Sequence, residues 1–217
     1  MIQRILKYFI LLFFFAIFYQ SCSNNIFVNP TENNKGINLI SGKIENWSYG
    51  DSIKIVAGEY RNIYGRGDSL YVFGSAKINP DGSFSLSLSN PSDTLTRRSA
   101  NGAYTFTDPG AKFTTLKVML FLPEGSLFKY IYNASNSPQE LKTGQYWIDY
   151  QYADRTVTMT GEDNGSTSLG PWIIKYNIDY KKGWNRVVEK LISTNNQMYN
   201  YECEVSDTSV GKWFISE

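Results

Sequence analysis

Strict alternation between apolar and polar side chains is the feature of this sequence that most restricts its fold. In Ser83–Ser89 every second residue is a serine, and the residues between them are Phe84, Leu86 and Leu88. In Trp172–Tyr180 an apolar or aromatic residue likewise occupies every second position. A period of two places all these side chains on one face of a β-strand, whereas a helix requires a period near 3.6. The sequence therefore predicts β-strands in both segments.

Alternation of the same kind covers most of the chain after residue 37. It is found in Ile53–Ala57, Leu70–Ile78, Leu116–Leu122, Arg155–Thr160 and Tyr199–Val205. Leu116–Leu122 is apolar on both faces apart from Lys117, as expected of a central strand that is covered on both sides. Asn79–Gly82 (NPDG) lies between two strand patterns and predicts a tight hairpin turn. Only Asn185–Ser193 could form a short helix, although its two adjacent valines disfavour one.

Strands separated by turns at intervals of about 8–12 residues are typical of β-sandwiches and barrels. The sequence therefore predicts an all-β fold, namely an antiparallel β-sandwich of the Ig-like or transthyretin-like kind. A lipocalin-like β-barrel is the alternative. Residues 37–217 can form one large domain or two small packed modules, with an internal boundary near 91–112.

The first 21 residues have the composition of a cleavable export signal. Arg4 and Lys7 give a positive start, and Tyr8–Tyr19 is an unbroken apolar run of 12 residues. A helix that spans a bilayer needs about 20 apolar residues, so this run fits the apolar core of a signal peptide better. Residues 22–36 are rich in asparagine and predict a flexible tether before the folded part.

Ser21-Cys22 follows the apolar run directly and resembles the lipobox of bacterial lipoproteins, although Tyr19 stands where that family usually has leucine. Bacteroidota-type lipoproteins have a looser form of this box. The resemblance implies that Cys22 becomes the first residue of the mature protein and carries the lipid. It also implies an outer-membrane lipoprotein of the cell envelope, held to the membrane through the lipid anchor. The periplasmic and the surface side are both open.

The composition excludes several classes of function. The chain has no histidine, so Ser-His-Asp and Cys-His catalysis in their usual forms and histidine-ligated metal sites are excluded. Lipidation of Cys22 leaves Cys203 without a partner for a disulfide. Removal of residues 1–21 leaves 19 basic and 20 acidic side chains, a balance that does not favour a nucleic-acid partner. No metal and no cofactor is predicted.

Two stretches resemble modules of exported bacterial proteins. Ile40–Leu88, which contains SGKIENWSYGDSIKIVAG and INPDGSFSLSL, resembles the carboxypeptidase-regulatory and transthyretin-like β modules. Tyr180–Ile192 (YKKGWNRVVEKLI) is similar to a Lys-Gly-Trp-Asn stretch of exported lipoproteins of unknown function. Both resemblances imply an exported β protein, and neither implies a reaction.

The predicted strand around Trp147 carries the best candidate binding residues. Alternation places Trp147, Asp149 and Gln151 on one face, and the aromatic and apolar residues between them on the other. An exposed tryptophan ring can stack on the apolar face of a sugar while polar neighbours hydrogen-bond its hydroxyls. We therefore predict a non-catalytic binding or structural module whose partner is a glycan or an envelope protein. The alternative for Trp147 is a ring covered by a neighbouring loop.

Two other functions are left open by the sequence. An adhesin- or fimbria-like assembly subunit would use exposed strand edges. A glycan-processing enzyme would use a pair of carboxylates, for which Asp149, Glu189, Glu202 and Glu204 are available. Glu202 and Glu204 alternate with apolar residues, which predicts a solvated position for both.

Three short segments fit the pattern Asp-(Ser/Thr)-aliphatic, which resembles the O-glycosylation acceptor of exported Bacteroidota-type proteins. Their acceptor residues are Ser52, Ser69 and Thr94. The alternative is that each aspartate only bonds the local backbone where a strand begins.

Overall fold

The structure is a computed structural model and describes residues 37–62, 68–92, 97–98, 103–137, 141–195, 198–208 and 210–216. The described residues belong to one compact unit. The predicted signal segment and Cys22 lie outside the described residues.

Fourteen strands and no helix occur among the described residues. The strands are β1 (Leu39–Lys43), β2 (Lys54–Asn62), β3 (Asp68–Lys77), β4 (Ser83–Ser87), β5 (Arg97–Arg98), β6 (Tyr104–Phe106), β7 (Lys112–Phe121), β8 (Leu127–Ala134), β9 (Tyr146–Ala153), β10 (Val157–Thr167), β11 (Gly170–Tyr180), β12 (Gly183–Asn195), β13 (Met198–Val205) and β14 (Lys212–Ile215). The predicted all-β class is therefore confirmed. Within the described residues there is no helix that could cross a membrane.

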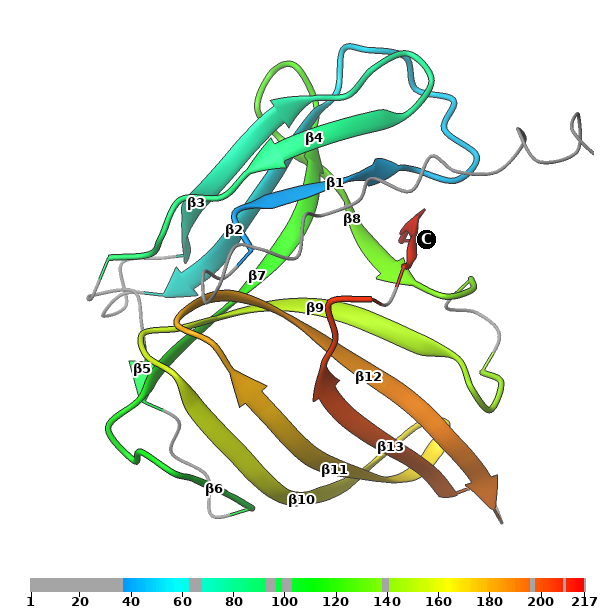
Figure 1. Cartoon of the computed structure of the whole chain (residues 1–217). Coiled ribbons are helices and arrows are strands. Elements are labelled where there is room, and N and C mark those ends of the chain that lie inside the picture. The colour runs from blue at the N-terminus through cyan, green and yellow to red at the C-terminus, as the bar shows by residue number, and fades with distance from the viewer. Residues whose placement is uncertain are drawn as a thin grey trace, which may run out of the picture. The chain divides into compact units, whose positions relative to one another are not determined.

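The strands form two sheets (Figure 1). β1 and β4 make a small antiparallel sheet. The large sheet has 12 strands in the order β3-β2-β7-β8-β9-β12-β13-β11-β10-β6, with β14 beside β8 and β5 beside β7. β13 lies between β12 and β11, which run in opposite directions, so it is antiparallel to β12 and parallel to β11. The large sheet is therefore mixed, which alternation along single strands does not reveal.

The small sheet packs on the part of the large sheet that contains β2 and β3, and the main hydrophobic core lies between them. Ile40 of β1 and Leu86 of β4 are each 1% exposed, because alternation turns them inward. Ile55 of β2 and Leu120 of β7 belong to the same buried cluster. Burial of such a side chain contributes about 1.5–3 kcal/mol. The two layers form the predicted β-sandwich.

The chain passes from the large sheet to the small sheet through Asn79–Gly82. The Asp81 carboxylate accepts hydrogen bonds from the hydroxyl and the backbone N–H of Ser83, at 2.7 and 3.0 Å. These bonds lower the pKa of Asp81 to about 2. β3 and β4 lie in different sheets, so the prediction of a hairpin is wrong. The turn is tight, but it joins two facing layers because β4 finds its partner in β1.

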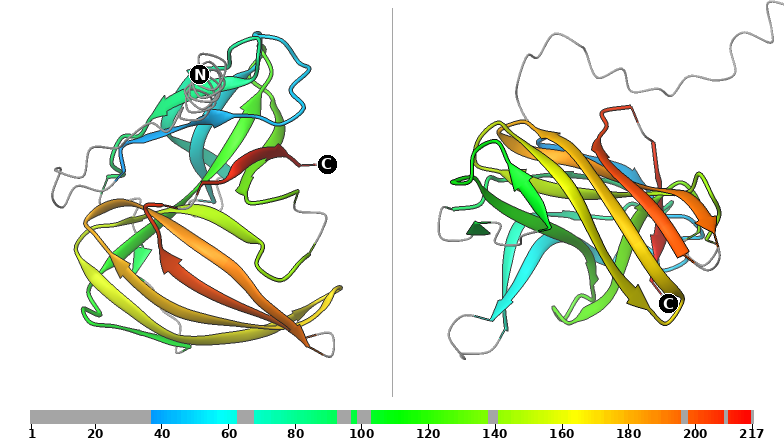
Figure 2. Two further views of the ribbon diagram at one scale, coloured as in Figure 1. Left: turned by 45° about the vertical axis from the view of Figure 1, so that its right-hand side comes forward. Right: turned by 90° about the horizontal axis from the view of Figure 1, so that it is seen from below.

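Strands β9 to β13 form a curved layer, drawn in yellow-green to orange-red in Figures 1 and 2. A second buried cluster lies on its inner face and includes Met159, Ile178 and Tyr180. Asn185–Ser193, the segment that could have formed a helix, lies within β12. Neither sheet closes into a barrel in the described part of the chain. The lipocalin-like alternative is therefore not adopted.

We expect Gly74→Ala to destabilise the sandwich. β3 runs close to the chain that follows β4, where the Ser89 N–H donates to the Phe73 carbonyl oxygen at 2.7 Å. A methyl group on Gly74 would overlap the backbone carbonyl oxygen of Ser87, which cannot move without breaking this contact. The free energy of unfolding should fall on the order of 1–3 kcal/mol, measured by urea denaturation. Ser75→Ala, one residue further along β3, is the control and should change it little; equal stability of Gly74→Ala would contradict the packing.

Candidate functional site

Strand β7 changes its hydrogen-bonded neighbour along its length. Phe113–Leu116 pairs with β9, whereas Val118–Phe121 pairs with β8. β8 and β9 in turn pair with each other at Asn133–Ala134 and Trp147–Ile148. The three strands therefore enclose a triangular opening in the large sheet, which we call the junction.

One residue of each strand lies between its two pairings. These residues are Lys117 of β7, Tyr132 of β8 and Asp149 of β9. All three are exposed, while the residues directly before and after each of them are buried. Alternation along the three strands therefore places an ammonium group, a phenol and a carboxylate on the open face of the junction.

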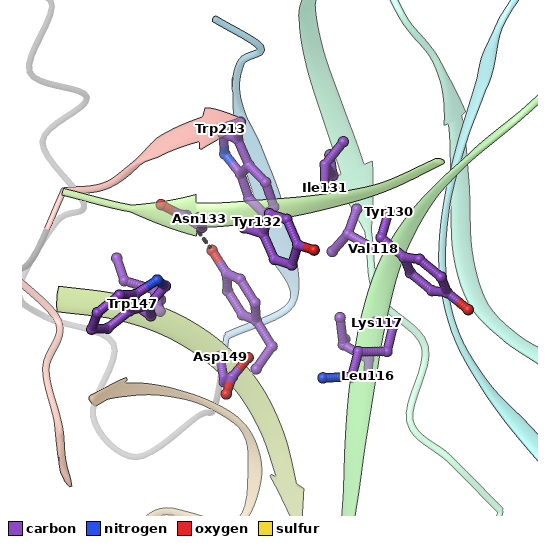
Figure 3. A pocket seen from close by; sticks show the side chains of 12 residues that line it. Leu116, Lys117, Val118, Tyr130, Ile131, Tyr132, Asn133, Trp147, Asp149 and Trp213 are labelled. Atoms are coloured by element: carbon purple, nitrogen blue, oxygen red, sulfur yellow. Dashed lines mark hydrogen bonds between the residues drawn. The ribbon is translucent and has the colours of Figure 1, made fainter. Parts of the chain in front are cut away.

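A pocket of about 270 Å³ lies at the junction (Figure 3). Residues of β7, β8 and β9 line it, together with Trp213 of β14. Its aromatic lining comes from Tyr130, Tyr132, Trp147, Tyr150 and Trp213. A pocket with mostly aromatic and apolar walls and few polar groups is the usual form of a small-ligand site.

The inner wall of the pocket belongs to the main core. The rings of Tyr150 and Trp213 are stacked, with centroids 6.2 Å apart and an interplanar angle of 4°. Both side chains are buried. Asn133 Nδ2 donates a hydrogen bond to the Tyr150 hydroxyl at 3.3 Å. Because these side chains are held by packing within strands, the pocket shape does not depend on a loop.

Lys117 and Asp149 face each other across the junction (Figure 3). The register that pairs Leu116 with Tyr150 would make Lys117 and Asp149 the next cross-strand pair, but β7 turns to β8 at Val118. Among the described residues neither side chain forms an ion pair or a hydrogen bond. The protein around Asp149 displaces water and raises the pKa of its carboxyl group, which the charge of Lys117 partly offsets. The side chain is nevertheless open to solvent, as expected of a group in a concave wall.

A second carboxylate, Glu189 of β12, lies beside this group. Glu189 is the cross-strand partner of Trp147 and is half-buried. Burial raises the pKa of Glu189 to about 7, and the charge of Asp149 adds to the effect. The Cys203 thiol lies 4.0 Å from Glu189 Oε2, and burial raises the pKa of this thiol as well. The face thus holds two carboxylates near Trp147, of which only Asp149 lines the pocket.

The structure brings two of the three predicted binding residues together. Trp147 and Asp149 line the pocket. Gln151 does not: its Oε1 accepts a hydrogen bond of 2.5 Å from the Tyr180 hydroxyl, next to the second cluster. The lining residues of β7 and β8 were missed, because the pattern of one strand does not name its neighbours. The sequence contained one indication of Lys117, because it is the only charged residue in the otherwise apolar segment Leu116–Leu122.

The other predicted sites lie outside the pocket. Glu202 and Glu204 are exposed on β13, as the alternation predicted. Ser52 and Ser69 are exposed, as a glycosylation acceptor must be, and Thr94 falls outside the described residues. No group of three or more acidic or cysteine side chains that could hold a metal ion occurs in the described part of the chain.

A second depression, of about 580 Å³, lies over β10, β11 and β13. Glu162, Lys175 and Glu202 stand side by side there in the strand register. Alternating charges on neighbouring strands compensate one another and are common on solvated sheet faces. The unpaired charges at the junction make its smaller pocket the better candidate.

No family model, no curated protein and no solved structure matches this chain.

We expect Glu189→Gln to stabilise the protein above neutral pH. Since the pKa of Glu189 is raised from 4.5 to about 7, the folded state binds more protons than the unfolded state between these values. The wild type therefore loses stability, relative to the variant, as pH rises through this interval. The difference should be near zero below pH 4.5 and on the order of 3 kcal/mol above pH 7, measured by urea denaturation at several pH values. Glu202→Gln, on the exposed face of β13, is the control; a variant whose advantage does not grow with pH would refute the burial of Glu189.

Proposed function

We propose that this protein is a lipid-anchored, non-catalytic binding module of the bacterial cell envelope. In this proposal a glycan unit binds in the pocket between β7, β8 and β9. The proposal joins the export and lipidation signals of the sequence with the geometry of the junction.

The position of Trp147 beside Asp149 in an aromatic-walled pocket is the observation that carries the proposal. A sugar ring has an apolar face and an edge of hydroxyl groups, so its site offers both a flat ring and hydrogen-bonding partners. The indole of Trp147 offers the flat surface. The carboxylate of Asp149 can accept hydrogen bonds from hydroxyls and the ammonium of Lys117 can donate them, and bonds to charged groups are the stronger ones.

The size of the pocket limits the ligand. Most small-molecule sites have volumes of about 300–1,000 Å³, and this pocket has about 270 Å³. It therefore suits one sugar ring, with the rest of a longer glycan extending into solvent. A lipid anchor at Cys22, followed by the tether of residues 22–36, would hold the module at the membrane with freedom to reach such a chain.

One observation favours a second candidate, a carboxylate-based glycan-processing enzyme. Asp149 and Glu189 lie on neighbouring strands, and Glu189 with a pKa of about 7 could act as a proton donor near neutrality. Glycoside hydrolysis needs both acids to reach the same bond. Because Glu189 does not line the pocket, we place binding before catalysis. Release of reducing sugar by the wild type, lost in Glu189→Gln, would reverse this order.

We expect Trp147→Ala to weaken glycan binding at least tenfold. The indole offers a flat apolar surface in this pocket, directly beside the carboxylate of Asp149, on which a sugar ring can stack. Binding to a panel of monosaccharides and envelope glycans is measured by calorimetry, with thermal unfolding to show that the variant is folded. Trp172→Ala removes a half-buried tryptophan of β11 that does not line the pocket, and it is the matched control. Ligands that bind both variants equally would place the site elsewhere.

We expect Cys22→Ser to release the protein from the membrane fraction. The resemblance to the lipobox implies that the lipid is attached to this cysteine alone, and two or more acyl chains are needed for stable anchoring. Detergent-phase partitioning and the mass of the amino-terminal peptide measure the effect. Cys203→Ser removes the chain's other cysteine, which is buried in the fold, and should leave the anchor intact. A wild-type protein with an unmodified Cys22 is the outcome that would end this part of the proposal.

A further inference from the structure

The junction holds apart two side chains that would otherwise form a cross-strand ion pair. Continuation of the β7–β9 register past Leu116 and Tyr150 would set Lys117 directly opposite Asp149. At that distance, about 4.5–5.5 Å between Cβ atoms, oppositely charged side chains attract each other. From Val118 onward, however, β7 pairs with β8. The pocket therefore lies between β7 and β9 at this position, and no Lys117–Asp149 ion pair forms.

Building on the proposed function, we propose that the bound sugar unit is a zwitterion. Its ammonium group binds Asp149, and its anionic group binds Lys117. The ligand thereby completes, through its own two charges, the ion pair that the strand junction leaves open.

The surroundings of the two residues give the ligand a direction. On the Asp149 side lie Trp147, whose ring can take a cation on its face, and the second carboxylate of Glu189. On the Lys117 side lie the phenols of Tyr130 and Tyr132, which line the pocket without a carboxylate next to them (Figure 3). Phenol hydroxyls can donate hydrogen bonds to an anion. The ammonium group therefore lies toward β12 and the anionic group toward β7 and β8.

Desolvation explains why a neutral sugar fits the pocket less well. Any ligand that fills it removes water from both Asp149 and Lys117. Hydroxyl groups replace that water with dipoles, whereas a zwitterion replaces it with opposite charges in hydrogen-bonding contact. The protein around the Asp149 carboxylate already displaces part of its water, and no described residue donates a hydrogen bond to it. Such a group gains most from a ligand that carries the missing positive charge.

Four sugars of one ring type test the inference: glucose, glucosamine, glucose 6-phosphate and glucosamine 6-phosphate. They differ only in the presence of an ammonium group, an anionic group or both. With the wild-type protein we expect glucosamine 6-phosphate to bind at least tenfold more tightly than glucose, with the two singly charged sugars between them. Calorimetry or ligand-observed NMR measures the dissociation constants at fixed ionic strength.

Two variants assign the charges to residues. Asp149→Asn should abolish the preference for the amino sugars and keep the preference for the phosphorylated ones, while Lys117→Met should do the reverse. Lys190→Met removes an exposed lysine of β12 that does not line the pocket, and it should leave all four dissociation constants unchanged. Neither substitution affects a core side chain, and thermal unfolding verifies the fold of each variant.

The outcomes separate this inference from the proposed function. If all four sugars bind equally and binding depends on Trp147, the proposed function stands and the zwitterion is wrong. If a singly charged sugar binds most tightly, the pocket recognises only one charge, and the proposal of a zwitterionic ligand is again wrong. If glycans bind independently of Trp147, or no sugar binds in the pocket, the proposed function fails together with the inference.

Discussion

The double burial of β7 is the constraint on which the rest of the structure depends. This strand pairs with β2, β5, β8 and β9. Its residues from Leu116 to Phe121 are buried on both faces, except for Lys117. A strand with two apolar faces has to be covered from both sides. The main core covers one face through Leu116, Val118 and Leu120, and on the other face Met119 and Phe121 pack with Val56. Phe113, near the start of β7, packs against the second cluster of the curved layer, so the two parts of the large sheet meet along β7.

The junction follows from this change of partner. An opening inside a sheet is normally unfavourable, because it leaves backbone groups without ladder partners and uncovers apolar side chains. Here each strand has a single residue between its two pairings. The stacked rings of Tyr150 and Trp213 close the opening from the core side. What faces solvent is therefore polar or aromatic, and the opening is a pocket with a rigid inner wall rather than a defect in the core.

Local pattern and strand partnership contributed very differently to what could be predicted from the sequence. Alternation within β9 was sufficient to put Trp147 and Asp149 on one face, because a period of two is a property of the strand itself. It could not show that Lys117 and Tyr132 complete the same pocket, since that depends on which strands pair. For the same reason the NPDG turn was recognised as tight but assigned to a hairpin. Gln151 lies on the predicted face of β9, but its hydrogen bond to Tyr180 holds its side chain next to the second cluster and outside the pocket.

The two carboxylates beside Trp147, those of Asp149 and Glu189, are not explained by the packing of the fold. Asp149 accepts no hydrogen bond among the described residues, and Glu189 accepts only a long one from the Cys203 thiol, at 4.0 Å. Burial raises the pKa of both carboxyl groups, and the charge of Asp149 raises that of Glu189 further, so ionisation of this pair costs free energy in the folded protein. Uncharged side chains of similar size would remove it without disturbing the packing. Lys117 compensates one of the two negative charges without forming an ion pair with Asp149. The negative charge beside Trp147 is therefore not fully balanced in the folded protein. An ammonium group bound there would balance this charge, and its charge-assisted hydrogen bond to Asp149 would contribute to the affinity.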